Sequence, residues 1–328
     1  MSVDEATEAQ IQELASRLQS VVEMMGKRLV GQQHVARRLL MGLMTQGHVL
    51  LEGLPGLAKT TAVKALSDTS DLSVRRIQFT PDLLPADVLG TQIYDPRSGG
   101  FLIKKGPIFA NLVIADEINR APAKVQSALL EAMQEGQVTI GDETFVLDQP
   151  FLVMATQNPI EQEGTYPLPE AQVDRFLFKV KVSYGSFDEE KEIVSRMASG
   201  REIPLERMIG KDDLILSREL LNQIYVADKI RHYIVELVCA SREPQKFGVR
   251  GMEGLIQVGA SPRASINLEK AARAAALMDG RSFVSPDDIK DIALDIMRHR
   301  LIPTYEAEAE NISQDDLVQM LLEQVNVP

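Results

Sequence analysis

Residues 53–60 have the types and spacing of a loop that binds phosphate. The loop reads Gly53, Leu54, Pro55, Gly56, Leu57, Ala58, Lys59 and Thr60, and it follows an apolar run at residues 49–51. Backbone N–H groups of such a loop, at the start of a helix, surround the β-phosphate of a nucleotide. Lys59 then supplies positive charge to the β and γ oxygens, and the Thr60 hydroxyl is a ligand for Mg²⁺. The alternative is a glycine–proline turn that exposes a lysine.

Two adjacent carboxylates, Asp116 and Glu117, follow a second apolar run at residues 112–115. Ligands of open α/β sheets bind at the carboxyl ends of the strands, so we expect both acids near the phosphate loop. Asp116 would then hold Mg²⁺, and Glu117 would polarise the attacking water. A strand that ends in two acids is also common as a helix cap, but the preceding phosphate loop favours the metal and water site.

Three further residues have types that suit a phosphate site. Asn158 ends an apolar run and offers an amide that could orient water, although Asn-Pro is also a frequent turn. Arg175 follows a predicted helix, where it can stabilise the charge of a transferring phosphoryl group or form a surface pair with Asp174. Arg263 falls in the first turn of a predicted helix, where the helix dipole disfavours a cation. This unfavourable position indicates that the side chain binds an anionic ligand; the alternative is an arginine exposed to solvent.

These residues require an alternation of strands and helices to position them. Apolar spacing predicts a helix over residues 8–25 and strands at 49–51, 112–115 and 151–155. Helical patterns lie between the strands at residues 59–66 and 122–134, the latter with Pro122 at its first position. The pattern predicts an α/β fold with helices on both faces of a parallel sheet.

Two segments interrupt this alternation, and the second half of the chain differs from the first. Residues 80–106 form an insert rich in Pro, Asp and Gly, and residues 136–148 read as a β-hairpin around Gly141 and Asp142. Beyond residue 184 helix caps multiply, at Ser186, Ser285 and Ser313. We therefore expect a nucleotide-binding core over residues 1–185 and a helical domain over residues 186–328.

The composition narrows the possible partners and location. The chain has 47 acidic and 35 basic side chains, which give a net charge of -12. This charge repels nucleic-acid backbones unless a local basic patch exists. One cysteine, Cys239, excludes an internal disulfide framework, and four scattered histidines do not suggest a metal cluster. No stretch approaches the roughly 18 apolar residues that span a bilayer. We expect a soluble, cytoplasmic protein without membrane insertion.

Taken in order, these motifs resemble the MoxR family of AAA+ ATPases. The most specific segment is LVIADEINRAPAKVQSALLEAM at residues 112–133, with ATQNP at 155–159, LPEAQVDR at 168–175 and SPR at 261–263. The resemblance covers about residues 25–325. Ala58 stands where the standard loop has glycine, and this is usual in the family.

The resemblance implies a P-loop AAA+ core of five parallel strands, an all-α lid and ATP bound between subunits of a ring, commonly a hexamer. In such a ring Asn158 senses the γ-phosphate, Arg175 is the finger that reaches the neighbour's site, and Arg263 is the lid sensor. The other residues implied to contact the nucleotide are Thr61 in the loop and, near the adenine, Val30 and Gly31 with Gln32. The sequence Val-Gly-Gln is equally typical of a helix start.

Relatives in this family are thought to act as chaperone-like remodelers, often with partners that carry von Willebrand factor A domains. The resemblance thus implies hydrolysis of ATP to remodel or mature a protein client. The insert and the hairpin both resemble segments that would project from the ring toward a partner.

Two other functions compete with this one. A DNA translocase or helicase motor can carry similar inserts, but the hairpin segment 137–149 has three acids and no Lys or Arg, and Lys104 with Lys105 is the only basic pair nearby. An ATP-gated scaffold would bind ATP with little turnover. The presence of Glu117 and Arg175 disfavours that scaffold.

Overall fold

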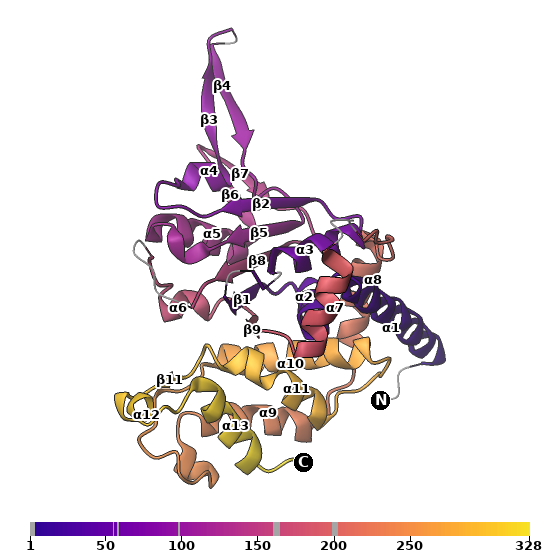
Figure 1. Ribbon diagram of the computed structural model, residues 1–328, viewed down its shortest axis with the longest axis vertical. Helices are drawn as coiled ribbons and strands as arrows, with labels where there is room; N and C mark the ends of the chain where they lie inside the picture. The colour runs from indigo at the N-terminus through magenta and orange to yellow at the C-terminus, as the bar shows by residue number, and fades with distance from the viewer. Residues whose placement is uncertain (1–3, 55, 58, 98, 160–164, 199–202) are drawn as a thin grey trace. The chain divides into compact units, whose positions relative to one another are not determined.

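The computed structural model describes residues 4–54, 56–57, 59–97, 99–159, 165–198 and 203–328 (Figure 1). They divide into two compact units. The sheet unit comprises residues 20–176 and 180–215, and the helical unit comprises residues 177–179 and 216–328 with the described part of 1–19. The predicted division at residues 185 and 186 coincides with none of these breaks, because residues 186–215 pack with the sheet unit. As a division into domains it stays a prediction.

A five-stranded parallel sheet with the order β2-β5-β8-β1-β9 forms the centre of the fold. Its strands are β1 Val49–Gly53, β2 Val74–Gln78, β5 Leu112–Asp116, β8 Leu152–Gln157 and β9 Phe178–Val182. The three predicted apolar runs are β1, β5 and β8, which lie next to one another and are almost wholly buried. Because they are parallel, the residues after each strand meet at one edge of the sheet.

The helices predicted at residues 8–25, 59–66 and 122–134 are present, with ends that differ by at most three residues, whereas the helix at 33–45 was not predicted. The helices of the first part of the chain are α1 Glu5–Gly26, α2 Gln33–Thr45, α3 Lys59–Asp68, α4 Pro85–Leu89, α5 Ala123–Glu135, α6 Glu170–Val173 and α7 Phe187–Met197, with the 3₁₀ turn η1 Ile118–Arg120. One detail of the prediction is wrong. Pro122 precedes α5 as its N-cap, because its ψ of 152° is extended rather than helical.

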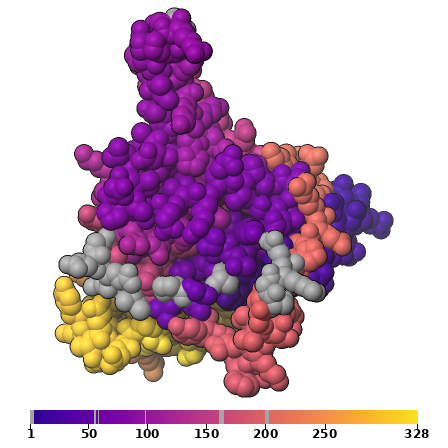
Figure 2. Space-filling model, turned by 45° about the horizontal axis from the view of Figure 1, so that its top comes forward, coloured from indigo at the N-terminus to yellow at the C-terminus, as the bar shows by residue number. Residues whose placement is uncertain are grey.

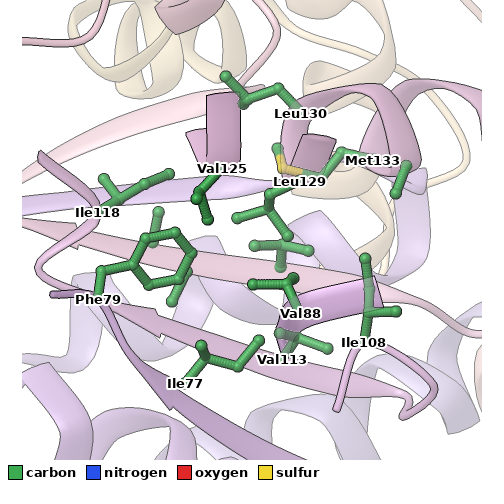
Figure 3. Close-up of a cluster of buried hydrophobic side chains, with 14 of the residues drawn as sticks. Ile77, Phe79, Val88, Ile108, Val113, Ile118, Val125, Leu129, Leu130 and Met133 are labelled. Atoms are coloured by element: carbon green, nitrogen blue, oxygen red, sulfur yellow. The ribbon is translucent and has the colours of Figure 1, made fainter. Parts of the chain in front are cut away.

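Helix α5 packs on the sheet through side chains spaced three and four residues apart. Figure 3 shows Val125, Leu129 and Met133 of α5 facing Ile77 of β2 and Val113 of β5. Each fully buried apolar side chain of this size contributes about 1.5–3 kcal/mol relative to exposure. This packing fixes α5 against the strand that carries Asp116.

Two hairpins extend from the sheet unit. The predicted hairpin is β6 Gln137–Ile140 with β7 Glu143–Val146, and Gly141 in its turn has φ +63°. The insert at 80–106 contains α4 and a second hairpin, β3 Gly90–Asp95 with β4 Gly100–Lys105. Figure 2 shows this second hairpin standing clear of the surface of its unit. Lys105, at the end of β4, links the two hairpins near their bases. Its Nζ lies 4.9 Å from the ring centre of Phe145 on β7 and 4.8 Å from that of Phe109.

The second half of the chain is mostly helical, as predicted. Its elements are α8 Lys211–Gln223, α9 Asp228–Ala240, η2 Pro244–Phe247, β10 Ile256–Val258, α10 Pro262–Met278, α11 Pro286–Met297, β11 Ile302–Pro303, α12 Tyr305–Ala309 and α13 Gln314–Gln324. The antiparallel pair β10 and β11 was not predicted, since strands of two or three residues have no readable periodicity. The predicted caps at Ser186, Ser285 and Ser313 are all confirmed.

Candidate nucleotide-binding site

The predicted phosphate loop joins the end of β1 to the start of α3 at the carboxyl edge of the sheet. Gly53 ends β1, and a Cβ atom there would lie 2.5 Å from the carbonyl oxygen of Val182 on β9. Gly56 has φ +86°, a conformation that residues with a Cβ atom rarely adopt. The backbone geometry therefore accounts for glycine at both positions. Pro55 and Ala58 lie outside the described residues.

Lys59 is the first residue of α3, and its half-buried side chain turns back along the loop. Its Nζ donates to the carbonyl oxygen of Gly53 and, at 3.4 Å, to that of Gln157 on β8. Burial lowers the pKa of the Lys59 ammonium, whereas the charges of Asp116 and Glu117 raise it. The predicted lysine and the two predicted acids thus interact electrostatically at one edge of the sheet.

Asp116 ends β5 and is largely buried among donors. Its Oδ1 accepts a hydrogen bond of 2.6 Å from the hydroxyl of Thr156 on β8. Its Oδ2 accepts from Arg76 on β2, at 2.6 Å from Nη2 and 3.2 Å from Nε. Neither donor was predicted from the sequence. Three neighbouring strands therefore hold this carboxylate.

Glu117 has a backbone conformation that is uncommon for a residue with a side chain. Its φ is +56°, and such a conformation persists where surrounding contacts enforce it. Its N–H donates to the Thr156 hydroxyl at 2.8 Å. Its Oε2 accepts from Arg120 at 2.9 Å and from Gln78 at 3.2 Å. The carboxylate is thereby held at the sheet edge, on the turn directly after β5.

The other residues predicted at the phosphates lie on the same edge. Thr60 and Thr61 follow Lys59 in the first turn of α3, and both are half-buried. Asn158 follows β8, and its carbonyl oxygen lies 3.5 Å from the side-chain nitrogen of Asn119. These positions agree with a site that spans the ends of β1, β5 and β8.

A cavity of about 630 Å³ opens beside the loop. Its walls come from four separate segments, which contribute Arg28, Leu29, Val30 and Gln32; Gly56, Leu57, Thr61 and Lys64; Ser183, Tyr184 and Gly185; and Glu190, Ile193, Met197 and Ile203. Pockets for small molecules are of this size and are lined mainly by apolar side chains with a few polar groups. The predicted residues Val30 and Gln32 belong to this wall, and Gln32 Nε2 lies 3.4 Å from the carbonyl oxygen of Leu57. The contribution of α7 was not predicted.

Two contacts hold the wall segments together. Gly31 lies between the wall residues Val30 and Gln32 and has φ +72°. The carboxylate of Glu189 on α7 lies against it. Arg28 forms an ion pair with Asp68 at the end of α3, and its Nε donates to the carbonyl oxygen of Ile203 at 2.7 Å. The cavity is thus built from contacts between distant parts of the sheet unit.

The two predicted arginines lie on different units. Arg175 follows α6 in the sheet unit and is half-buried, and its N–H donates to the carbonyl oxygen of Gln172 at 3.2 Å. Arg263 is the second residue of α10 in the helical unit, after the N-cap Ser261, and it is exposed.

Comparison with known proteins places this site in a class. Residues 48–178 match the model of the ATPase family associated with various cellular activities (AAA), and residues 252–321 match the AAA lid domain. A crystal structure from Cytophaga hutchinsonii is 48% identical with a TM-score of 0.92, over 99% of this chain and 98% of that one. The fold is therefore that of an AAA-type ATPase core followed by an AAA lid domain.

The relatives narrow the class to one family. The chain is 48% identical to Chaperone MoxR1 of Mycobacterium tuberculosis over 92% of this chain and 79% of the relative. It is 30% identical to Protein MoxR of Methylorubrum extorquens, over 92% of each. This chain belongs to the MoxR family of AAA+ ATPases. A full-length MCM homolog from Methanopyrus kandleri shares only the fold, at 18% identity and a TM-score of 0.59.

Proposed function

We propose that this chain hydrolyses ATP to ADP and phosphate in a ring of identical subunits, and that the ring uses the energy to remodel a protein client. The observation that carries the proposal is that Lys59, Asp116 and Glu117 all contact the end of β8, Lys59 at Gln157 and the two acids at Thr156, so they meet at one edge of the sheet. A positive charge for phosphates and two carboxylates for a metal and a water are the parts that phosphoryl transfer needs. The large cavity beside them can take the rest of a nucleotide.

ATP binding divides between the loop and the cavity. Lys59 and the loop N–H groups bind the phosphates, and the apolar wall with Val30, Leu57 and Ile193 takes the base. Burial of Lys59 favours this role, because a desolvated ammonium interacts more strongly with an anion than one in water. Nucleotide binding would therefore be lost in Lys59→Ala.

The residues at the sheet edge fit Mg²⁺. Thr60 and Asp116 offer hard oxygen atoms, and Mg²⁺ is usually held by one or two protein oxygens together with waters and substrate phosphates. No group of three or more His, Cys, Asp or Glu side chains that could hold a metal alone occurs within the described residues. A bound Mg²⁺ would supply charge that neutralises the phosphates.

Glu117 is the proposed base. It orients a water and takes its proton, while the water oxygen bonds to the γ-phosphorus and the bond from phosphorus to the β–γ bridging oxygen breaks. Asn158 helps to orient this water, and Arg175 of the adjacent subunit stabilises the negative charge that develops. Arg263 reports the bound state to the lid. These roles come from motif positions and residue chemistry.

A protein client is favoured over nucleic acid. One relative is named a chaperone, and the β6–β7 hairpin has acids at Asp142 and Glu143, which repel phosphates. We extend the proposal to a hexameric ring and to a partner with a von Willebrand factor A domain, as the family resemblance implies. Within the described residues, no helix has the length and apolar character to cross a bilayer. A cytoplasmic location remains a prediction.

The first test is steady-state ATP hydrolysis as a function of protein concentration. The specific activity of the natural chain should rise with concentration, because a site shared between subunits forms only on assembly. Arg175→Ala should remove this activity, and Arg207→Ala, at an exposed arginine of the same unit, should not. A rate per chain that stays constant with dilution and survives Arg175→Ala would contradict a shared site.

A second test separates binding from turnover. Glu117→Gln should bind ATP and lose hydrolysis, since the amide cannot take a proton. Mixed with Arg175→Ala subunits it should restore turnover, because each variant supplies what the other lacks at their interface. Normal hydrolysis by Glu117→Gln alone would remove Glu117 from the role of base.

A further inference from the structure

Gln126 of α5 has a fully buried side chain that touches two segments of different function. Its Nε2 lies 3.3 Å from the carbonyl oxygen of Ile118 and 3.0 Å from that of Ala121. It also lies 3.0 Å from the carbonyl oxygen of Tyr166. Residues 118–121 form the turn directly after Glu117, whereas Tyr166 lies in the segment that leads into α6.

The chemistry of Gln126 indicates that these contacts, and not packing, account for an amide at this position. Three carbonyl oxygens around one end of the side chain require the nitrogen there, so its orientation is determined. Its Oε1 has no hydrogen-bond partner among the described residues, which costs free energy in a buried position. A methionine would fill a similar volume without that cost. The amide at this position is therefore explained by its donor nitrogen, Nε2, and not by its oxygen.

Other hydrogen bonds continue the link from the turn to Arg175. The Tyr166 N–H donates to the carbonyl oxygen of Asn119 in the turn at 2.6 Å, and the Tyr166 carbonyl is linked to the same turn through Gln126. Further along, Gln172 of α6 donates to the Ser127 hydroxyl of α5 at 3.2 Å. The Gln172 carbonyl accepts from the N–H of Arg175. Two sets of hydrogen bonds, which meet at the adjacent residues Gln126 and Ser127 of α5, thus connect the segment after Glu117 to the segment that carries Arg175.

We propose that Gln126 is a positioning residue that couples the state of a subunit's own Glu117 to the placement of the Arg175 that the same subunit offers to its neighbour. This inference rests on the proposed function, in which the two residues act in different sites. Ile118 and Ala121 lie on the short turn that begins at Glu117, whose φ is +56°, so a change in the Glu117 backbone would displace their carbonyl groups. Gln126 transmits that displacement to Tyr166. Packed side chains and hydrogen bonds of this kind can carry coupling between two sites.

The experiment uses mixtures in which each type of subunit has one task. A donor subunit carries Glu117→Gln and supplies Arg175, and an acceptor subunit carries Arg175→Ala and supplies Glu117. Gln126→Met is then added either to the donor or to the acceptor. We expect the recovered turnover to fall about fivefold when the donor carries it and distinctly less when the acceptor does. A loss in the acceptor that equals or exceeds the loss in the donor overturns the coupling role.

Matched variants protect this comparison from trivial effects. Gln134→Met makes the same chemical change at an exposed position of α5 and should leave both mixtures unchanged. Binding of a fluorescent ATP analogue by Gln126→Met donors shows that the variant folds. If that binding is lost, Ser127→Ala decides instead, since it removes only the hydroxyl that accepts from Gln172. A loss of about twofold confined to the donor then supports the inference, and equal losses overturn it.

The same data separate this inference from the proposed function. If the unmodified donor and acceptor mixture recovers no turnover, hydrolysis at a shared site is wrong. If it recovers turnover and Gln126→Met has no larger effect in the donor, only the coupling role of Gln126 is wrong.

Discussion

Arg76 donates two hydrogen bonds to the same carboxylate oxygen of Asp116, at 2.6 Å from Nη2 and 3.2 Å from Nε. Asp116 is the proposed Mg²⁺ ligand, and the guanidinium occupies the oxygen that Thr156 leaves available. The arginine side chain is half exposed, so it can move aside at small cost. The guanidinium, as a cation bound at this oxygen, therefore competes with a divalent ion.

Replacing Arg76 with Gln should lower the Mg²⁺ concentration needed for half-maximal ATP binding by about three- to tenfold. The expected size corresponds to about 1 kcal/mol, as for partly exposed ion pairs. The measurement is a Mg²⁺ titration of ATP binding by calorimetry. Arg75→Gln, whose side chain alternates to the other face of β2, should leave the titration unchanged. A higher Mg²⁺ requirement in Arg76→Gln would mean that Arg76 supports the site instead of competing.

Thr156→Val should reduce both stability and turnover, because one hydroxyl serves both carboxylate residues. The hydroxyl donates to Asp116 and accepts from the Glu117 N–H, and valine can do neither. We expect the free energy of unfolding to fall by about 2 kcal/mol and turnover by at least about tenfold. Urea unfolding and ATP hydrolysis measure the two. Thr156→Ser keeps the hydroxyl and should keep most of the turnover; equal losses in Ser and Val variants would assign the effect to the methyl group.

His48 should make stability depend on pH through its burial. Its Nδ1 accepts from the Val153 N–H at 3.0 Å, so Nε2 carries the hydrogen that it donates to the Met133 carbonyl, also at 3.0 Å. Burial lowers the pKa of His48 to about 4, below the value of about 6.5 in an unfolded chain. The unfolded chain thus binds more protons in this range, and stability is complete above about pH 6.5 and is lost as the pH falls toward 4.

Between pH 7 and pH 5 this histidine should account for a loss of about 2 kcal/mol in the free energy of unfolding. In His48→Gln that part of the pH dependence should disappear, whatever the stability of the variant at pH 7. The comparison is urea unfolding followed by circular dichroism at both pH values. His34→Gln, at an exposed histidine, serves as control. An identical pH dependence in the natural chain and His48→Gln would contradict the assigned pKa.

The two described glycines of the phosphate loop should differ in their tolerance of alanine. At Gly53 a new methyl group meets the Val182 carbonyl of the adjacent strand, and the strands must separate or tilt. At Gly56 the space is open and only the positive φ opposes the change. We expect Gly53→Ala to cost about 1–3 kcal/mol of stability and to weaken ATP binding more than Gly56→Ala, which should cost about 1 kcal/mol. Thermal unfolding and nucleotide titration provide the comparison, and the reverse order would contradict it.

Much of the central sheet could be predicted because its inner strands are buried on both faces. Residues 112–115 form a continuous apolar run, as expected for a strand covered by helices on each side. Strand β2 was not identified because it lies at the edge, where Arg75, Arg76 and Gln78 interrupt the apolar pattern around Ile77. The motif residues Lys59, Asp116 and Glu117 could be found because their spacing relative to strand and helix is local.

The supporting residues of the site could not be predicted in the same way. Thr156, Arg76 and Gln126 each act on a residue about forty positions away or on backbone groups, and such pairings depend on strand order and helix packing. The only local signal was a threonine at the polar end of an apolar strand. The wall from α7 was missed because Ile193 and Met197 fit the pattern of any amphipathic helix.

The wall of the cavity also bears on how the newly made chain matures. Its segments run from Arg28 to Ile203, so an unfinished chain that lacks α7 has the phosphate loop but only part of the pocket. Tight nucleotide capture must then await synthesis and folding of the whole sheet unit. A ligand that binds only the folded form adds about 2.7 kcal/mol of stability at a hundred times its dissociation constant. ATP bound at the proposed site would thus stabilise completed sheet units relative to unfinished chains.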